Sequence, residues 1–148
     1  GVSAFLHAST IRDIVGERTA RRRCERKGAL YVDVEKKKKI ADDVAFNAAF
    51  KALQEEKLVK AGSKLDDLSF YHPVPSADCA DGYKSRIGIH EVLPVSSAIR
   101  DIILHSSTSD AIEAQAKKEG MLTMLEDGLY KAARGITSLE EVLRAISE

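Results

Sequence analysis

The stretch DGYKSRIGIHEVLPV, residues 81–95, decides the fold, because it carries the clearest strand pattern in a chain whose other periodic segments are typical of helices. Apolar residues alternate along it, and one face consists of Ile87, Ile89 and Leu93. Gly82 and Gly88 interrupt the pattern, and Gly88 is typical of a bulge or of a close approach by another backbone. We therefore expect a short strand that lies on a helical array through its isoleucine face.

The composition limits the classes of protein to which the chain can belong. Its 148 residues suit one domain with a small subdomain, and 23 basic residues balance 23 acidic ones, so no net charge attracts nucleic acid or an anionic membrane. Charged residues interrupt every apolar run before the roughly 20 residues that a membrane span requires. No signal peptide is visible. Two widely separated cysteines predict no disulfide framework, so we expect a cytoplasmic protein.

Helical periodicity covers most of the chain. We predict helices over the segments 3–23, 40–60, 96–105, 108–120, 122–135 and 137–148. Ser138 and Glu141 have the spacing of a capping box, and Gly120 and Gly135 are expected helix stops. The predicted fold class is α+β and mainly helical: a helical array with a short antiparallel strand piece near residues 68–93, and several times more helix than strand.

Three blocks of the sequence resemble the C-terminal end of the secretion ATPases that drive type II secretion and type IV pilus assembly. The blocks are FLHASTIRDIVGERTARRRC (5–24), GYKSRIGIHEVL (82–93) and KKEGMLTMLEDGLYKAARGITSLEEVLR (117–144). Within the second block, the residues that match the family pattern and are expected to be structural are Gly82, Tyr83, Arg86, Gly88 and Glu91. The resemblance implies three parts: a helix from the end of the motor domain (1–27), a degenerate metal-knuckle lobe (28–83), and a strand with closing helices (84–148).

The resemblance implies a motor, but the chain lacks the motor's phosphate-binding loop. The family's ATPases are hexamers at the cytoplasmic face of the inner membrane that use ATP and Mg²⁺. No segment here matches G-x-x-x-x-G-K-[ST], whose backbone N–H groups and lysine hold the phosphates. We therefore expect an ATPase parent, but no catalysis and no cofactor in this chain by itself. The implied partners are neighbouring subunits of the hexamer and an inner-membrane platform protein, which would place the chain at the membrane periphery.

A metal site is a further implication of the resemblance. The family carries two Cys-x-x-Cys pairs that bind Zn²⁺, whereas only Cys24 and Cys79 remain here. Two thiols are too few for a closed site, which normally has four ligands, although His72 and Asp78 could complete one. Two alternatives stay open: the cysteines pack as small apolar residues, or they form a disulfide, which requires oxidising surroundings.

Arg86 has two interpretations. An arginine at this position can bind a phosphate or a carboxylate with two parallel hydrogen bonds. A structural ion pair with Glu91 or another nearby acid is the commoner arrangement. Tyr83 is expected to pack the strand onto the helices.

Two functions of different class remain open. In the first, the chain is an accessory region of a pilus-assembly or secretion motor, with contact surfaces in the basic run 17–27 and the acidic region 110–148. In the second, it is a free-standing helical adaptor that binds a protein or a nucleic acid through the same basic run. The zero net charge argues against nucleic acid.

Overall fold

Two long antiparallel strands form the centre of the molecule. The computed structural model describes residues 10–24, 30–31, 47–56, 59–60, 63, 67–105 and 108–147. Strand β1 (Asp13–Arg23) pairs with β4 (Tyr83–Pro94), and the register runs from Asp13 opposite Pro94 to Arg21 opposite Arg86 before a bulge. Ala20 of β1 and Ile89 of β4 are fully buried beneath the helices. The strand predicted from residues 81–95 is thus confirmed, and its isoleucine face is the buried one.

The prediction of a helix over residues 3–23 is wrong for residues 13–23, which form β1; residues 3–9 lie outside the described part of the chain. The spacing of Ile11, Ile14 and Val15 matched a helix face locally. Ten pairs of residues between β1 and β4 outweigh that local preference, because each strand supplies the other's hydrogen-bond partners.

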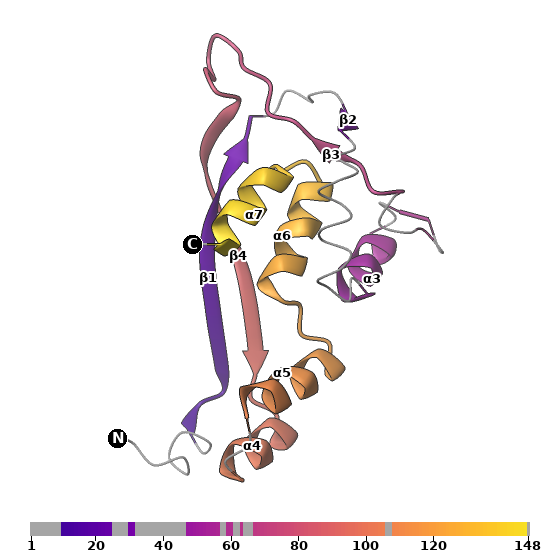
Figure 1. The fold of residues 1–148 in the computed structure, drawn as a ribbon, viewed down its shortest axis with the longest axis vertical. Coiled ribbons are helices and arrows are strands. Elements are labelled where there is room, and N and C mark those ends of the chain that lie inside the picture. The colour runs from indigo at the N-terminus through magenta and orange to yellow at the C-terminus, as the bar shows by residue number, and fades with distance from the viewer. Residues whose placement is uncertain are drawn as a thin grey trace.

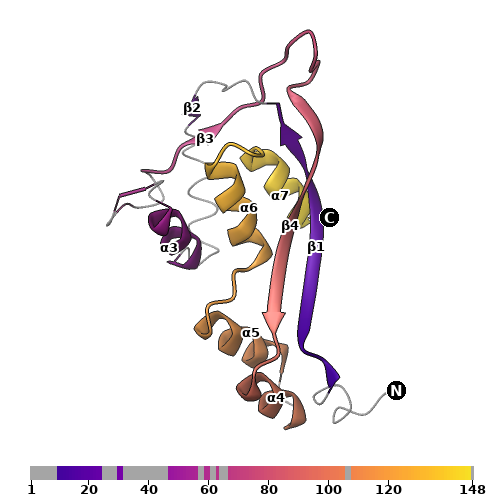
Figure 2. The same cartoon turned by 180° about the vertical axis from the view of Figure 1, so that it is seen from behind.

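Four helices follow β4 in the chain. They are α4 (Ser97–Leu104), α5 (Ser109–Lys118), α6 (Met124–Ala133) and α7 (Leu139–Ser147). Gly120 and Gly135 have positive φ angles of 96° and 74° after α5 and α6, so both predicted helix stops are confirmed. Figures 1 and 2 show α6 and α7 beside the long strands, with α4 and α5 at the end of the molecule where β4 finishes.

The capping box lies at a different helix from the predicted one. Thr123 and Glu126 form it at the start of α6, where each side chain bonds the other residue's backbone N–H. At α7, Ser138 Oγ accepts from the Glu141 N–H at 3.3 Å, as expected. The Glu141 carboxylate does not reach back to Ser138, because two arginines hold it.

A small lobe lies on the far side of α6. Strand β2 (Leu30–Tyr31) pairs with β3 (Phe70–Tyr71), and α3 (Asn47–Glu55) lies against α6 (Figure 1). The lobe and the closing helices share one apolar core, whose fully or almost fully buried members are Leu53, Leu68, Phe70, Leu129, Ala132, Leu139 and Val142. A second core under α4 and α5 contains Val95, Ile99, Ala116 and Met121.

The α+β class is confirmed, but the predicted proportions are not. In the described part of the chain, five helices of eight to ten residues accompany strands of 11 and 12 residues, so helix does not exceed strand several-fold. Strands β3 and β4 lie in the predicted region 68–93, but each pairs with a strand from before residue 32. No described helix is both long and apolar enough to cross a membrane.

Candidate functional site

Glu141 in the first turn of α7 is the centre of an ion-pair network that joins the helix to β1. Its side chain is only 3% exposed, and its Oε1 lies 2.9 Å from Arg21 Nη2. The backbone N–H of Arg21 donates to Glu141 Oε2 at 2.9 Å, and Arg144 Nη2 donates to the same oxygen at 3.1 Å. Burial alone would raise the pKa of Glu141, but the hydrogen bonds from Arg21 and Arg144 lower it to about 2. The carboxylate therefore stays charged and anchors α7 to the strand.

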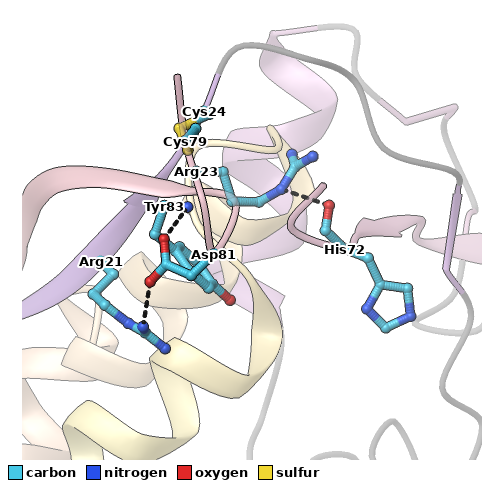
Figure 3. Close-up of a disulfide and its surroundings, with 7 residues drawn as sticks. All are labelled: Arg21, Arg23, Cys24, His72, Cys79, Asp81 and Tyr83. Atoms are coloured by element: carbon cyan, nitrogen blue, oxygen red, sulfur yellow. Dashed lines mark hydrogen bonds and ion pairs between the residues drawn. A yellow bond between two sulfur atoms is a disulfide. The ribbon is translucent and has the colours of Figure 1, made fainter. Parts of the chain in front are cut away.

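Tyr83 extends this network to the start of β4. Its hydroxyl lies 2.7 Å from Ser138 Oγ, and the Arg21 guanidinium stacks 4.2 Å from the ring centroid. Arg21 Nη1 also binds Asp81 Oδ2 at 3.1 Å, as Figure 3 shows. Burial raises the pKa of the Tyr83 hydroxyl. Tyr83 thus packs the strand onto the helices, as the sequence predicted.

Arg23 connects β1 to the small lobe. Its Nε donates to the backbone carbonyl of His72 at 3.0 Å, and its Nη1 donates to the carbonyl of Gly135 at 2.8 Å. The guanidinium carbon lies 5.3 Å from the centroid of the Tyr71 ring. Burial lowers the pKa of Arg23. A single buried cation therefore ties together β1, the chain after β3 and the turn between α6 and α7.

Cys24 and Cys79 form a disulfide that joins the residue after β1 to the segment before β4 (Figure 3). Their Cα atoms are 6.8 Å apart, and 55 residues separate them in sequence. The Cys24 backbone N–H donates to the carbonyl of Gly82 at 3.0 Å, which places the bond beside the first residues of β4. Of the alternatives considered above, the structure contains the disulfide rather than two separate packed thiols.

The donors available near the cysteines do not fit a four-ligand zinc site. The His72 carbonyl accepts from Arg23, and its imidazole points away from the disulfide (Figure 3). Asp78 lines the same cavity as the two cysteines, which has a volume of about 480 Å³. Within the described ranges, no three His, Cys, Asp or Glu residues lie close enough together to hold a metal ion. Zinc binding at the two cysteines stays a prediction.

A second polar cluster covers the outer edge of β4. The backbone N–H of His90 donates to Asp127 Oδ2 at 2.8 Å, and Lys131 Nζ donates to the carbonyl of Gly88 at 2.9 Å. Asp127 and Lys131 also pair with each other across one turn of α6. The edge of β4 that faces away from β1 is therefore hydrogen-bonded by a helix.

The family-matching glycines both relieve close contacts. A Cβ atom on Gly82 would lie 2.7 Å from the backbone nitrogen of Val74, and the φ angle of Gly82 is 75°. A Cβ atom on Gly88 would lie 2.6 Å from the His90 ring. Gly88 is not a bulge, because the register with β1 is regular there, and the atoms nearest to such a Cβ belong to side chains that can move rather than to a backbone.

Arg86 does not pair with Glu91. Arg86 is exposed, and the ion pairs among the described residues do not include it. Glu91 Oε2 instead accepts the backbone N–H of Met124 at 3.2 Å, at the start of α6. Glu91 therefore joins β4 to the start of α6 rather than to Arg86.

The sequence does not reveal the role of the arginines of β1. Arg18, Arg21 and Arg23 belong to the basic run 17–27 that is predicted as a contact surface, yet each binds a separate internal acceptor. Their spacings of three and two residues do not give the period of a strand, so the sequence carries no local signal that separates them. Glu141 was identified only as a helix cap, and nothing local in the sequence shows that Arg21 lies opposite it.

Comparison with known proteins places this arrangement in a family. The family described as "Type II/IV secretion system protein" matches residues 1–144. The chain belongs to the type II/IV secretion system protein family. The predicted resemblance to secretion and pilus-assembly ATPases is thereby confirmed.

The chain is similar to proteins that are named as pilus assembly ATPases or as secretion system proteins. The type IV pilus assembly ATPase PilB of Pseudomonas aeruginosa is 32% identical over 148 residues, covering all of this chain and 23% of that protein. The type II secretion system protein E of Xanthomonas campestris pv. campestris is 32% identical over 152 residues, with the same coverage of 100% and 23%. PilB of Thermus thermophilus is 52% identical over 62 residues, 42% of this chain and 7% of that protein. The chain thus spans about a quarter of the length of the first two relatives.

Proposed function

We propose that the chain serves as the C-terminal accessory region of a hexameric ATPase that powers type IV pilus assembly or type II secretion. The observation that carries this proposal is the match over the whole chain to the type IV pilus assembly ATPase PilB and to the type II secretion system protein E, of each of which it spans 23%. In this role the chain performs no catalysis. It stiffens its subunit and contacts a neighbouring subunit or a membrane platform protein, which holds it at the cytoplasmic face of the membrane; in that reducing compartment Cys24 and Cys79 would be free thiols.

The internal bonding of the chain supports a mechanical role. Glu141, Tyr83 and Arg23 join the long strands to the closing helices and to the small lobe through partners 49 to 120 residues away in sequence. Force applied to one lobe is therefore transmitted through charge-assisted hydrogen bonds rather than through loops. The sequence of the chain contains no phosphate-binding loop, so nucleotide would be bound elsewhere in the longer protein.

The adaptor alternative finds less support. It requires the basic run 17–27 to be available for a partner, yet three of its arginines already have internal partners: Ala145 for Arg18, Glu141 for Arg21 and His72 for Arg23. Arg22 is exposed. Residues 25–27 lie outside the described part of the chain. Salt-dependent binding of RNA or DNA by the purified chain would revive this alternative.

A segment exchange tests the proposed function. The matching segment of the P. aeruginosa pilus assembly ATPase is replaced by this chain, and pilus assembly is measured in cells that lack their own copy of the enzyme. We expect the chimera to restore pili, a version with the segment deleted to fail, and the purified chain alone to show no ATP turnover. A deletion version that assembles pili as well as the chimera would contradict the proposal, as would ATP turnover by the chain alone.

A further inference from the structure

The backbone around Cys24 and Cys79 is held by contacts other than their disulfide. The Cys24 N–H donates to the Gly82 carbonyl at 3.0 Å, and the Gly82 N–H donates to the Cys79 carbonyl at 3.1 Å. Ser76 and Cys79 also exchange two backbone hydrogen bonds, at 2.9 and 3.0 Å. The two sulfur atoms therefore stay within reach of each other after reduction, and the bond can form again without a search through loop conformations.

The proposed location of the chain and the bond in the structure are two ends of one reaction. In a reducing compartment the two cysteines are free thiols, whereas the structure contains their disulfide. Thiol–disulfide exchange converts either form into the other. In the part of the chain that the structure describes, no third donor stands close enough to hold the two thiols on a metal ion instead.

The two sulfur atoms differ in how an external reagent can reach them. Cys79 is only 7% exposed, whereas Cys24 is partly exposed. A cavity of about 480 Å³ borders both residues, and a second cavity, of about 310 Å³, also borders Cys24. The larger volume lies within the range of roughly 300–1,000 Å³ that is typical of small-molecule sites. A reagent in these cavities therefore meets Cys24 first, and Cys79 is the internal thiol that completes the exchange.

The lining of the larger cavity is cationic. Arg22, Arg23 and Lys84 border it, and among the described residues the single acid there is Asp78. Arg22 and Lys84 are exposed, and neither side chain forms an ion pair or hydrogen bond with a described residue. A cleft lined by one sign of charge concentrates ligands of the opposite sign and raises their association rate roughly 10- to 1,000-fold. The site is therefore suited to an anionic reagent.

We propose that Cys24 and Cys79 form a thiol–disulfide exchange site for an anionic peptide disulfide of the glutathione type. Cys24 releases its proton to water, and its sulfur attacks the reagent, whose S–S bond breaks; one glutathione leaves and takes up a proton. The Cys79 sulfur then attacks Cys24 in the mixed disulfide, and the second glutathione leaves in the same way. The two protein thiols are oxidised, and one reagent disulfide is reduced to two thiols. The reverse reaction rests on the proposed function, which places the chain in a reducing compartment.

The exchange changes how the small lobe is attached to the long strands. The segment between the two cysteines contains β2, α3 and β3, and the bond closes this segment into a ring at the end of β1 and the start of β4. In the thiol form, the hydrogen bonds of Arg23 and the shared apolar core attach the lobe. Oxidation therefore adds a covalent clamp between the lobe and the sheet.

Two disulfide reagents of opposite charge test the site. The reduced chain, freed of reductant, is mixed at neutral pH with oxidised glutathione, which is anionic, or with cystamine, which is cationic. Mass spectrometry of acid-quenched samples gives each rate of oxidation, and division by the rate for the chain unfolded in urea removes the reagent's own reactivity. We expect the normalised rate to be more than about tenfold higher for oxidised glutathione than for cystamine. Equal rates, or a preference for cystamine, would overturn the proposal.

Charge reversal in the cavity tests the cause of that preference. Arg22→Glu combined with Lys84→Glu should reduce the ratio of the two normalised rates to about one. Arg12→Glu combined with Lys118→Glu makes the same change in net charge at exposed residues before β1 and on α5, and should keep the preference. A cavity variant that keeps the preference would overturn the proposal. If that variant does not fold, the reagent comparison on the unsubstituted chain decides by itself.

Single cysteine variants test the order of attack. The Cys79→Ser chain should accumulate a mixed disulfide between Cys24 and glutathione. The Cys24→Ser chain should react more than about tenfold more slowly, because its remaining thiol is buried. Equal rates for the two variants would overturn the proposal, as would stoichiometric zinc in the reduced parent chain that blocks its oxidation by glutathione disulfide.

The outcomes separate this proposal from the proposed function. The exchange measurements use the chain alone and do not depend on pilus assembly. A chimera that assembles no pili contradicts the proposed function and leaves the exchange site intact. A chain that shows no preference for the anionic reagent overturns the exchange site and leaves the proposed function intact.

Discussion

Asp127 accepts the backbone N–H of His90 at 2.8 Å, so a carboxylate on α6 occupies the place that a neighbouring strand's carbonyl would take. Lys131, one turn later, donates to the Gly88 carbonyl at 2.9 Å and takes the place of that strand's N–H. The side chain of Asp127 is only 17% exposed and that of Lys131 only 15%, so water does not readily replace either of them. The two residues therefore satisfy the His90 N–H and the Gly88 carbonyl at the outer edge of β4.

Removal of the Asp127 carboxylate should destabilise the folded protein. Asp127→Ala leaves the His90 N–H and the Lys131 ammonium without their partner, which should lower the free energy of unfolding by about 1–3 kcal/mol. Chemical denaturation of the variant checks the value. Asp110→Ala, which removes an exposed acid from the first turn of α5, is the matched control and should change stability by less than about 0.5 kcal/mol. Equal effects of the two substitutions would show that the edge contact contributes nothing.

Glu141 should make stability fall at acid pH. Its pKa in the folded protein is about 2, below the ordinary value of 4.5, so its contribution is fully present above pH 4.5 and is lost as the pH falls towards 2. The shift corresponds to about 3 kcal/mol at most. Glu141→Gln should remove most of this contribution at neutral pH and flatten the stability curve between pH 4.5 and 2. Denaturation at a series of pH values measures both effects.

The control for Glu141 is Glu113→Gln, which changes a half-exposed carboxylate on α5. The Glu113→Gln variant should lose stability at acid pH as steeply as the parent chain does. A Glu141→Gln variant whose stability still falls as steeply as that of the parent between pH 4.5 and 2 would assign the acid sensitivity to other groups.

Two glycines with positive φ angles should respond differently to alanine. At Gly120 an added Cβ meets no atom within 4 Å, so only the backbone conformation opposes the substitution, at about 1 kcal/mol. At Gly82 the added atom would also lie 2.7 Å from the Val74 nitrogen and from Pro73 Cβ. Gly82→Ala should therefore cost about 3 kcal/mol or more, because the chain before β4 must shift. Thermal melts of the two variants give the comparison, and equal melting temperatures would contradict it.

The part of the fold that the sequence predicted correctly is the part governed by local chemistry. Ile87 and Ile89 alternate with polar residues, and the glycines after α5 and α6 stand where helices must stop. These patterns can be recognised from neighbours within a few residues, although β4 still needs the distant β1 as its hydrogen-bond partner.

The part that failed depends on distant partners. Gly16, Arg18 and Ala20 lie on the side of β1 that faces the helices. They do not give the alternating apolar pattern of a half-buried strand, so the sequence predicts a helix here. Arg18 lies there because Nη1 binds the Ala145 carbonyl at 2.7 Å, near the end of α7, where a cation is favoured. Only knowledge of the fold reveals that acceptor, 127 residues away.

The disulfide between Cys24 and Cys79 should stabilise the small lobe mainly through the unfolded chain. A cross-link over 55 residues restricts the denatured ensemble by up to about 4 kcal/mol in the chain-entropy model. Cys24→Ala, Cys79→Ala and the double variant should therefore lose the same stability in non-reducing buffer, and the parent chain should match them in reducing buffer. Thiol alkylation with mass spectrometry, together with elemental analysis, is the accompanying measurement. Stoichiometric zinc in the reduced chain, lost in either single variant, would show instead that the two thiols bind metal with ligands from outside the described residues.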